Sequence, residues 1–345
     1  MKTSVIPVFL PHIGCPYRCI FCNQWKITGH QGMPAREEIK KQIDEYTASA
    51  KDERYWELAF YGGSFTALPE PVQNEWLALA QDALEKKKIQ AIRLSTRPDC
   101  MDHDIAARLA SYGVTIVELG VQSMDDAVLR MAKRGHTAED VRRAVSVLKE
   151  FPFSVGLQFM PGLPGETEES FRYTIREIAA LQPDFVRIYP VVLIEDTELE
   201  ILYREKKYTP LTVAQAVPMA AWAKEELAAY GIRSVRTGLQ ATEELDQGTS
   251  VIGGAYHPAF GELADSWRYR TKLAAALDAM KPSGEHVTIF YHRQDTSKIR
   301  GRKNGTVKRF CLRYGNRILW KEDNTISPGM CRIIGEEERI LIKLD

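Results

Sequence analysis

The first part of the chain alternates short apolar runs with amphipathic helical stretches, a pattern that few folds accommodate. Six runs are dense in Val, Ile, Leu, Phe or Tyr, as β-strands are. They occupy residues 4–10, 55–61, 91–96, 115–121, 154–160 and 185–190. Strands that alternate with helices pair in parallel through right-handed crossovers, and nearly continuous apolar residues indicate that both faces are buried. We therefore predict an α/β fold with a complete or partial (β/α)6 barrel, and a doubly wound open sheet as the alternative.

The character of the sequence changes after about residue 240. The glycine-rich stretch GGAYHPAFGEL leads into a helical pattern, which KPSGE interrupts. Short runs follow that we expect to form antiparallel strands, at 286–292, 307–315, 317–323, 330–338 and 339–345. The expected turns are Asn304-Gly305, Gly315-Asn316 and Pro328-Gly329. The expected domains are a partial barrel over 1–240, a loop and helix covering the barrel over 241–285, and a small β-rich C-terminal domain over 286–345.

Composition limits the class of protein but not its partner. Hydrophobic residues make up 44% of the chain and charged residues 27%, as in ordinary globular proteins. The 46 basic and 46 acidic residues balance, so the total charge neither favours nor excludes a polyanion. MKTSVIPVFLPHIG is a poor signal peptide, and no run of about eighteen apolar residues occurs. We expect a cytoplasmic protein with reduced thiols and no membrane partner.

The stretch CPYRCIFC brings three of the six cysteines, Cys15, Cys19 and Cys22, into eight positions directly after the first strand. The carboxyl end of a barrel strand is where an active site is expected. A structural zinc site usually has four ligands, so zinc would need His12 or His30 as the fourth. A cluster of cysteines without any metal would be open to oxidation. Three thiolates in one tight loop therefore favour a larger inorganic centre.

An iron–sulfur cluster explains the number of cysteines better than zinc does. Thiolates normally hold all four irons of a 4Fe-4S cluster, so three cysteines leave one iron open to a substrate or cofactor. The spacing C-x3-C-x2-C, with aromatic Phe21 before the last cysteine, resembles the signature of the radical S-adenosylmethionine (SAM) superfamily. The resemblance implies a 4Fe-4S cluster held by Cys15, Cys19 and Cys22.

The same resemblance implies that SAM binds the open iron and is cleaved to a 5′-deoxyadenosyl radical. The ends of the other strands should then contact SAM. At the end of the second strand, the paired glycines Gly62-Gly63 would let the backbone approach a ligand closely. The residues expected to contact SAM are Gly62, Gly63, Ser64, Ser95, Arg97, Glu118, Gln122 and Met160. The plain alternatives are strand-ending turns, polar strand ends facing water and core packing. We expect a bulky residue at Gly63 to weaken SAM binding and spare the cluster.

Several segments resemble one branch of the superfamily more closely. FYGGSFTALPE, STRPDCM and LGVQSMDDAVLRMAKRGHT resemble the radical SAM domain of the catalytic subunit of Elongator, over residues 10–235. That enzyme adds a carboxymethyl-type group, from acetyl-CoA, to the wobble uridine of tRNA. An acetyltransferase domain would need on the order of 150 residues, the size of a typical domain, and far fewer follow the expected C-terminal helix. We therefore expect a small bacterial Elongator-like protein without the acetyltransferase part. Directly before Thr-Arg-Pro-Asp, Ser95 stands where the family has an acidic residue. A weaker resemblance extends to oxygen-independent coproporphyrinogen oxidase-like proteins.

Two stretches could contact the substrate. The first is a basic run expected at a hairpin tip, with Lys298, Arg300, Arg302 and Lys303 and then Lys308 and Arg309. Such a patch suits an RNA backbone, although a solvated turn is the plain alternative. The second is the glycine-rich stretch with Tyr256 and His257, which suits a loop over the barrel mouth or simple packing.

Three functions are compatible with the sequence. The first is a radical SAM enzyme that modifies a tRNA base, and the second is a radical SAM enzyme acting on a small molecule such as a tetrapyrrole. The third is a zinc- or cluster-stabilised binding protein without turnover. Fold alone does not choose between them. For either enzyme we expect an electron donor such as flavodoxin or ferredoxin.

Overall fold

The computed structural model describes residues 2–10, 12–29, 32–49, 52–239, 250–280, 286–315, 317–335 and 339–344. Contacts divide the chain into two compact units, which are described separately below. The first unit comprises residues 1–212 and 226–258, and the second comprises 213–225 and 259–345. The domain limits predicted from the sequence stay a prediction, because groups of contacts do not show which pieces fold on their own. Among the described residues, no helix is long and apolar enough to cross a membrane.

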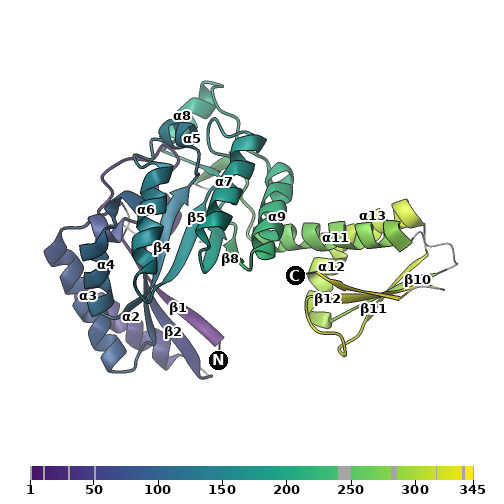
Figure 1. The fold of residues 1–345 in the computed structure, drawn as a ribbon, viewed down its shortest axis with the longest axis horizontal. Coiled ribbons are helices and arrows are strands. Elements are labelled where there is room, and N and C mark those ends of the chain that lie inside the picture. The colour runs from purple at the N-terminus through teal and green to yellow at the C-terminus, as the bar shows by residue number, and fades with distance from the viewer. Residues whose placement is uncertain are drawn as a thin grey trace. The chain divides into compact units, whose positions relative to one another are not determined.

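The first unit is built on a parallel sheet that curls into a partial barrel (Figure 1). Its strands pair in the order β1-β2-β3-β4-β5-β6-β8. They are β1 (Lys2–Phe9), β2 (Arg54–Tyr61), β3 (Ala91–Thr96), β4 (Val114–Gln122), β5 (Ser154–Phe159), β6 (Phe185–Ile188) and β8 (Arg233–Thr237). All six predicted barrel strands are present and parallel, so the predicted fold class is confirmed.

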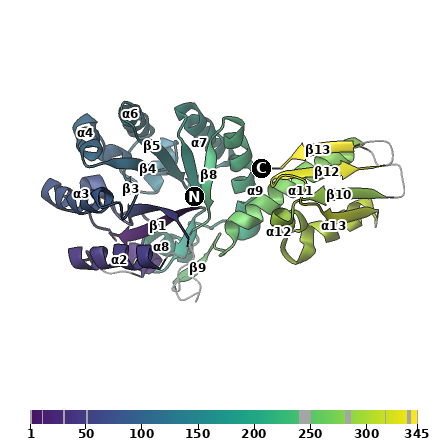
Figure 2. The same ribbon diagram turned by 90° about the horizontal axis from the view of Figure 1, so that it is seen from below.

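Helices cover the outer side of this sheet, as Figure 2 shows for α2, α3, α4, α6 and α7. The helices of the unit are α1 (Gln24–Thr28), α2 (Arg36–Ala48), α3 (Glu70–Glu85), α4 (His103–Ser111), α5 (Asp126–Met131), α6 (Ala138–Lys149), α7 (Glu168–Leu181) and α8 (Glu198–Arg204). Helix α9 (Val213–Ala229) is shared between the two units. Helices α6 and α7 each begin at a threonine N-cap. The Thr137 side chain accepts a hydrogen bond from Asp140 N, and the Thr167 side chain accepts one from Ser170 N.

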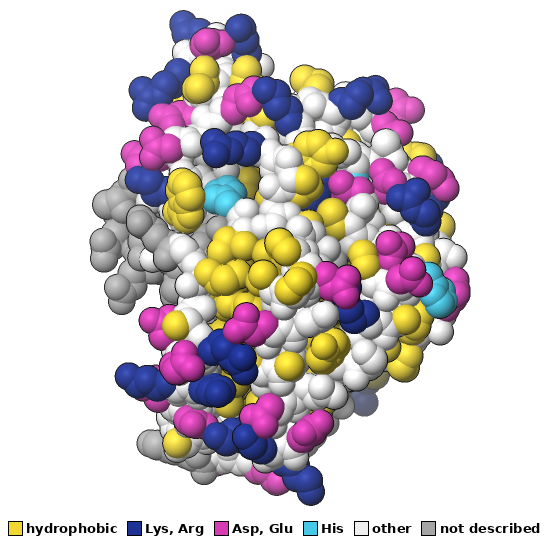
Figure 3. All heavy atoms as spheres, turned by 90° about the vertical axis from the view of Figure 1, so that its left-hand side faces the viewer, with side chains coloured by type: hydrophobic (Ala, Val, Ile, Leu, Met, Phe, Trp, Pro, Cys, Tyr) yellow, Lys and Arg dark blue, Asp and Glu magenta, His cyan; other side chains and the backbone are white. Residues whose placement is uncertain are grey.

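Two parts of the first unit were not predicted. The seventh strand, β8, pairs in parallel with β6, but its sequence RSVRT contains a single apolar residue and gave no strand signal. A short antiparallel pair joins β7 (Val192–Ile194) to β9 (Val251–Gly254). On the face of this unit that Figure 3 shows, acidic and basic side chains lie intermixed around a central group of hydrophobic side chains.

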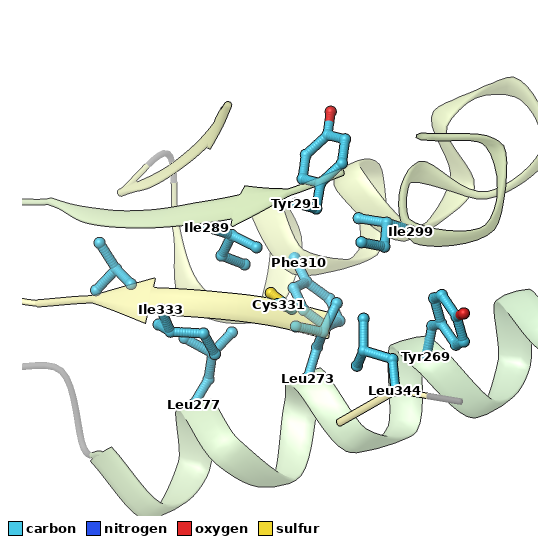
Figure 4. Packing of buried hydrophobic residues seen from close by; sticks show 11 residues of the cluster. Tyr269, Leu273, Leu277, Ile289, Tyr291, Ile299, Phe310, Cys331, Ile333 and Leu344 are labelled. Carbon is cyan, nitrogen blue, oxygen red and sulfur yellow. The ribbon is translucent and has the colours of Figure 1, made fainter. Parts of the chain in front are cut away.

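The second unit packs helix α11 (Phe260–Met280) against a four-stranded sheet of order β11-β10-β12-β13. Its strands are β10 (Val287–Tyr291), β11 (Ile318–Glu322), β12 (Met330–Ile334) and β13 (Arg339–Lys343). In its core, Leu273 and Leu277 of α11 pack with Cys331 and Ile333 of β12, and all four side chains are buried (Figure 4). The predicted β-rich C-terminal extension is therefore present.

One predicted strand of the extension is wrong. Residues 307–315 fall mainly in helix α13 (Gly305–Tyr314), which follows the short helix α12 (Thr296–Arg300). Val307, Phe310 and Tyr314 are spaced by three and four residues, which is a helical period, and Phe310 and Tyr314 pack into the core. Because helices connect β10 to β11, these strands are parallel. The predicted hairpin tip at Asn304-Gly305 is instead the start of α13.

Candidate functional site

The cysteine loop follows β1 and is held against the end of β2. Leu10 N donates to Tyr61 O at 2.7 Å, and Ser64 N donates to Ile13 O at 3.2 Å. Gly63 makes this contact possible, since a Cβ atom there would lie 2.2 Å from Ile13 O. Gly14 lies on the other side of the contact and has φ of +74°. A Cβ atom there would lie 2.4 Å from Ser64 O. Two glycines therefore let two backbones touch and fix the start of the loop.

The three cysteine side chains are free and partly exposed. Cys22 N donates to Cys19 O at 3.1 Å, which turns the loop tightly between these two residues. Cys19 and Cys22 pack against a buried cluster that includes Phe21, and Met160 from the end of β5 packs against the same cluster. The aromatic residue of the motif thus anchors the loop against side chains of α5, β7 and α8. Three partly exposed thiols on an anchored loop fit the donor set of an iron–sulfur cluster.

The alternative of a single zinc ion has no support in this arrangement. Among the described residues, no three His, Cys, Asp or Glu side chains are placed to hold one metal ion. The Nε2 atom of His12 accepts a hydrogen bond from Gln24 N at 2.9 Å, so it is turned toward helix α1. His30 lies outside the described residues. A four-iron cluster places its thiolates on different irons and therefore needs them farther apart than a single ion does.

Burial controls the protonation of the thiols. Burial, with Cys19 nearby, raises the pKa of the Cys22 thiol to about 12. Burial also raises the pKa of Cys15, and the positive charge of Arg134 opposes that rise. Because the thiolate is the form that binds iron, the metal must displace these protons. A cation close to the loop helps it to do so.

Arg134 supplies that cation and was not among the predicted site residues. Its Nη1 atom donates to Cys19 Sγ at 3.3 Å, and its Nη2 atom donates to Gly120 O at 2.7 Å. The side chain is buried. A Cβ atom on Gly120 would lie 2.7 Å from Arg134 Nη2, so this glycine leaves room for the guanidinium. The available sequence signal was the segment KRGHT, which lies in a stretch that resembles the radical SAM domain of Elongator's catalytic subunit.

Tyr17, inside the cysteine motif, is a second residue that the sequence did not single out. Its ring centroid lies 4.8 Å from Arg97 Cζ. A Cβ atom on Gly135 would lie 2.5 Å from the same ring. Arg97 is 2% exposed and is fixed by Asp99 and by Arg134 O. The loop is therefore clamped between the ends of β3 and α5, and the position of Tyr17 between Cys15 and Cys19 was the available signal.

Several buried nitrogen atoms near the contact of Tyr17 with Arg97 have no hydrogen-bond partner among the described residues. Among the buried atoms without a hydrogen-bond partner in the described structure are Arg97 Nη1, Arg134 Nε and His136 Nδ1. Burial, with Arg134 and Arg97 nearby, lowers the pKa of His136 to about 3, so the ring stays neutral. Buried donors are normally satisfied. The donors of Arg97 and Arg134 fit a bound group that carries oxygen or sulfur acceptors.

The predicted SAM contacts lie along β2 to β5, and contact with SAM stays a prediction. Gly62 has φ of +91° and follows β2, whereas the missing Cβ of Gly63 faces the cysteine loop. Ser64 is buried and its hydroxyl bonds to Thr96 Oγ1 at 3.1 Å. Ser95 is partly exposed near the end of β3. Gly63 and Ser64 thus serve internal packing in the structure.

Glu118 and Gln122 on β4 also have partners inside the barrel. The Glu118 carboxylate, 4% exposed, pairs with the guanidinium groups of Arg93 and Arg187. Gln122 has φ of +67°, its side chain accepts from Gln158 at 3.2 Å, and its carbonyl accepts from Met160 N at 2.9 Å. The left-handed backbone at Gln122 turns the chain where β4 ends.

The predicted substrate contacts fall in both units. Tyr256 packs against the cluster formed by Val192 and Ile194, and the neighbouring His257 is partly exposed. Lys298 pairs with Asp295 at 3.7 Å in the second unit. In the same unit, Arg300 donates to Asn304 at 3.0 Å and to the Tyr291 hydroxyl at 3.4 Å, and Arg302 and Lys303 are exposed. A role in substrate binding stays a prediction for all six.

Replacing Arg134 by glutamine should make the reconstituted cluster harder to reduce. The change removes a hydrogen bond and a positive charge from Cys19 Sγ, and both stabilise an added electron. We expect the midpoint potential to fall by about 60 mV, equivalent to about 1.4 kcal/mol for one electron. A redox titration followed by electron paramagnetic resonance measures it. Arg130→Gln, at an exposed position of α5, is the control, and equal potentials in all three proteins would contradict the assigned role.

Comparisons with known proteins agree with this geometry. The model of the radical SAM superfamily matches residues 10–178, and that of the radical SAM C-terminal domain matches residues 183–270. An uncharacterized protein of Methanocaldococcus jannaschii is 30% identical over 244 residues, which cover 66% of this chain and 73% of that protein. The tRNA uridine(34) acetyltransferase of the same organism is 28% identical over 261 residues, 64% of this chain and 48% of the relative. This chain thus spans about half the length of that enzyme.

Among solved structures, the fold matches the archaeal Methanocaldococcus infernus Elp3 with a TM-score of 0.60 and 25% sequence identity. The match covers 79% of this chain and 64% of the Elp3 chain. The predicted resemblance to Elongator's catalytic subunit is therefore confirmed.

Proposed function

The chain belongs to the radical SAM superfamily, and from this premise we propose that it is an enzyme that modifies a base of tRNA. Members of the superfamily use a 4Fe-4S cluster and SAM. When bound, the cluster supplies the electron that cleaves SAM to a 5′-deoxyadenosyl radical.

Cys15, Cys19 and Cys22 would hold the cluster, and the Gly63–Ile13 contact presents them at the end of β1. Arg134 neutralises part of the thiolate charge through its hydrogen bond to Cys19. Arg97 orients the loop through Tyr17 and keeps one donor free for a bound acceptor. The apolar cluster around Phe21 excludes water from the inner side of the loop, which protects a reactive radical from side reactions.

The choice of tRNA rests on one observation. The similarity to tRNA uridine(34) acetyltransferase extends over 64% of this chain, far beyond the three-cysteine motif. Because the chain spans only about half of that enzyme, the group transferred is left open. The proposal also includes cytoplasmic location, where tRNA is found, and reduction by an electron donor such as flavodoxin or ferredoxin.

The test is anaerobic reconstitution with iron and sulfide, followed by measurement of 5′-deoxyadenosine with reductant and SAM. We expect cleavage of SAM, and we expect bulk tRNA to increase its rate several-fold because substrate binding completes the site. Cleavage that tRNA leaves unchanged would redirect the search to small molecules such as tetrapyrroles. Absence of cleavage by a protein with a full cluster would contradict the proposed enzyme.

A further inference from the structure

The net charge of zero hides an uneven distribution between the two units. The first unit contains 28 lysines and arginines against 34 aspartates and glutamates, a net charge of −6. The second contains 18 against 12, a net charge of +6. A polyanion is attracted by clustered positive charge rather than by the total. Electrostatic contact with a phosphate backbone is therefore expected at the second unit.

Several cations of the second unit have acidic partners. Arg268 pairs with Glu225, Arg313 with Asp278 and Arg332 with Asp323. Lys303, Lys308 and Arg309, by contrast, are exposed and form no ion pair in the part of the chain that the structure describes. Lys303 lies just before α13, and Lys308 and Arg309 lie on it. Three exposed cations without an ion pair in the described residues thus lie within the seven positions 303–309, although the unit carries others elsewhere, such as Arg317 and Lys343.

Arg270 of α11 extends this segment. Its guanidinium lies 4.1 Å from the centroid of the Trp267 ring, which fixes the side chain without neutralising it. The Tyr314 hydroxyl of α13 donates to Ala274 O of α11 at 3.3 Å, so the two helices are adjacent. Burial and the nearby Arg309 lower the pKa of Arg270. Like charges held together cost free energy in the absence of an anion. A ligand phosphate would relieve that cost.

The form of α13 favours RNA over a lipid surface. A helix that lies on a membrane inserts an apolar face, but Phe310 and Tyr314 of α13 are packed into the protein core. Leu312 is the large apolar side chain that α13 exposes. The helix therefore presents mainly charge, which suits phosphodiester groups on the outside of a folded RNA.

We infer that Arg270, Lys303, Lys308 and Arg309, here called the α11–α13 basic surface, bind the phosphate backbone of RNA. On the proposed function, that RNA is the tRNA substrate. Contacts to phosphates position a nucleic acid without reading its sequence. The surface therefore supplies affinity, while recognition of the target base belongs to the barrel.

The experiment compares the full-length wild type with the quadruple variant Arg270→Gln, Lys303→Gln, Lys308→Gln and Arg309→Gln. Binding of bulk tRNA is measured by fluorescence anisotropy at several salt concentrations. Loss of four phosphate contacts should weaken binding by about tenfold or more and lower the salt slope by roughly three units. A triple variant that keeps Arg270 covers the case that the half-buried residue is needed for folding, and it should show most of the effect.

Two controls separate charge position from total charge. The charge-keeping variant Arg270→Lys, Lys303→Arg, Lys308→Arg and Arg309→Lys should bind tRNA like the wild type. Replacing four paired cations of the first unit (Lys41, Lys86, Arg172 and Arg204) by glutamine should leave the salt slope near the wild-type value. Equal affinity and slope in the wild type and the triple and quadruple variants would overturn the inference.

Two further results separate this inference from the proposed function. SAM cleavage without RNA should be the same in the quadruple variant and the wild type, because the variant leaves the cysteine loop unchanged. If the wild type cleaves SAM but binds no tRNA, both the tRNA proposal and the inference fail. If it binds vesicles of phosphatidylcholine and phosphatidylserine through these residues and not tRNA, the inference fails in favour of a lipid surface.

Discussion

Replacing any one of Cys15, Cys19 and Cys22 by alanine should give a folded protein that neither assembles a stable cluster nor cleaves SAM. In the proposed site each thiolate would hold a different iron, and with the fourth iron already open we expect the cluster not to tolerate a second free corner. Formation of 5′-deoxyadenosine should fall below detection. Iron and sulfide content, visible absorbance and electron paramagnetic resonance measure the loss of the cluster directly.

Cys311→Ala is the matched control for this prediction. Cys311 is an exposed cysteine in the second unit and lies outside the three-cysteine motif, so its loss should leave iron content and cleavage unchanged. Circular dichroism should show the same helix content in all four variants, since the motif cysteines are partly exposed. Wild-type iron content in the Cys19→Ala variant would contradict the assigned ligands.

Replacing Gly63 by alanine should disturb the cysteine loop itself. The new Cβ atom would lie 2.2 Å from Ile13 O and 2.5 Å from Leu10 O, and neither is the flexible end of a side chain. Forcing the backbones apart should cost on the order of 3 kcal/mol. We expect a lower melting temperature and a large loss of iron after reconstitution. The sequence had suggested that the cluster would survive a larger residue here, and the contact with the loop reverses that expectation.

Gly253→Ala is the control for Gly63→Ala. Gly253 lies in β9 of the same unit, and a Cβ atom there meets nothing within 4 Å. Stability and iron content should therefore match the wild type. If Gly63→Ala keeps full iron content but binds SAM weakly, the glycine serves SAM, as the sequence suggested, and the packing argument is wrong.

The barrel was predictable because its strands carry a strong and repeated signal. Strands buried on both faces, such as LAF within β2, are continuous apolar runs that need no tertiary information. Strand β8 was not predicted, because this edge strand contains two arginines and has no continuous apolar run. Residues 307–315 have a density of apolar residues that also suits a strand, which is why helix α13 was not predicted. The spacing of three and four residues between Val307, Phe310 and Tyr314 indicates the helix.

The site was predictable only where the chemistry is local in sequence. Cys15, Cys19 and Cys22 are close in the chain, so their spacing alone indicates the cluster. Arg134 reaches Cys19 across 115 positions, and a contact of that kind depends on the barrel bringing α5 beside the loop. The role of Gly63 is likewise a contact between two loops, and a pair of glycines in a sequence does not reveal which atoms they approach.

If this protein uses radical chemistry to change a base of tRNA, the change should be visible in the tRNA itself. Bulk tRNA is incubated with reconstituted enzyme, SAM and reductant, digested to nucleosides and examined by mass spectrometry. We expect a nucleoside of altered mass that forms with the wild type and is absent with Cys19→Ala. Production of 5′-deoxyadenosine by the wild type without any change in the tRNA nucleosides would show that tRNA is not the substrate.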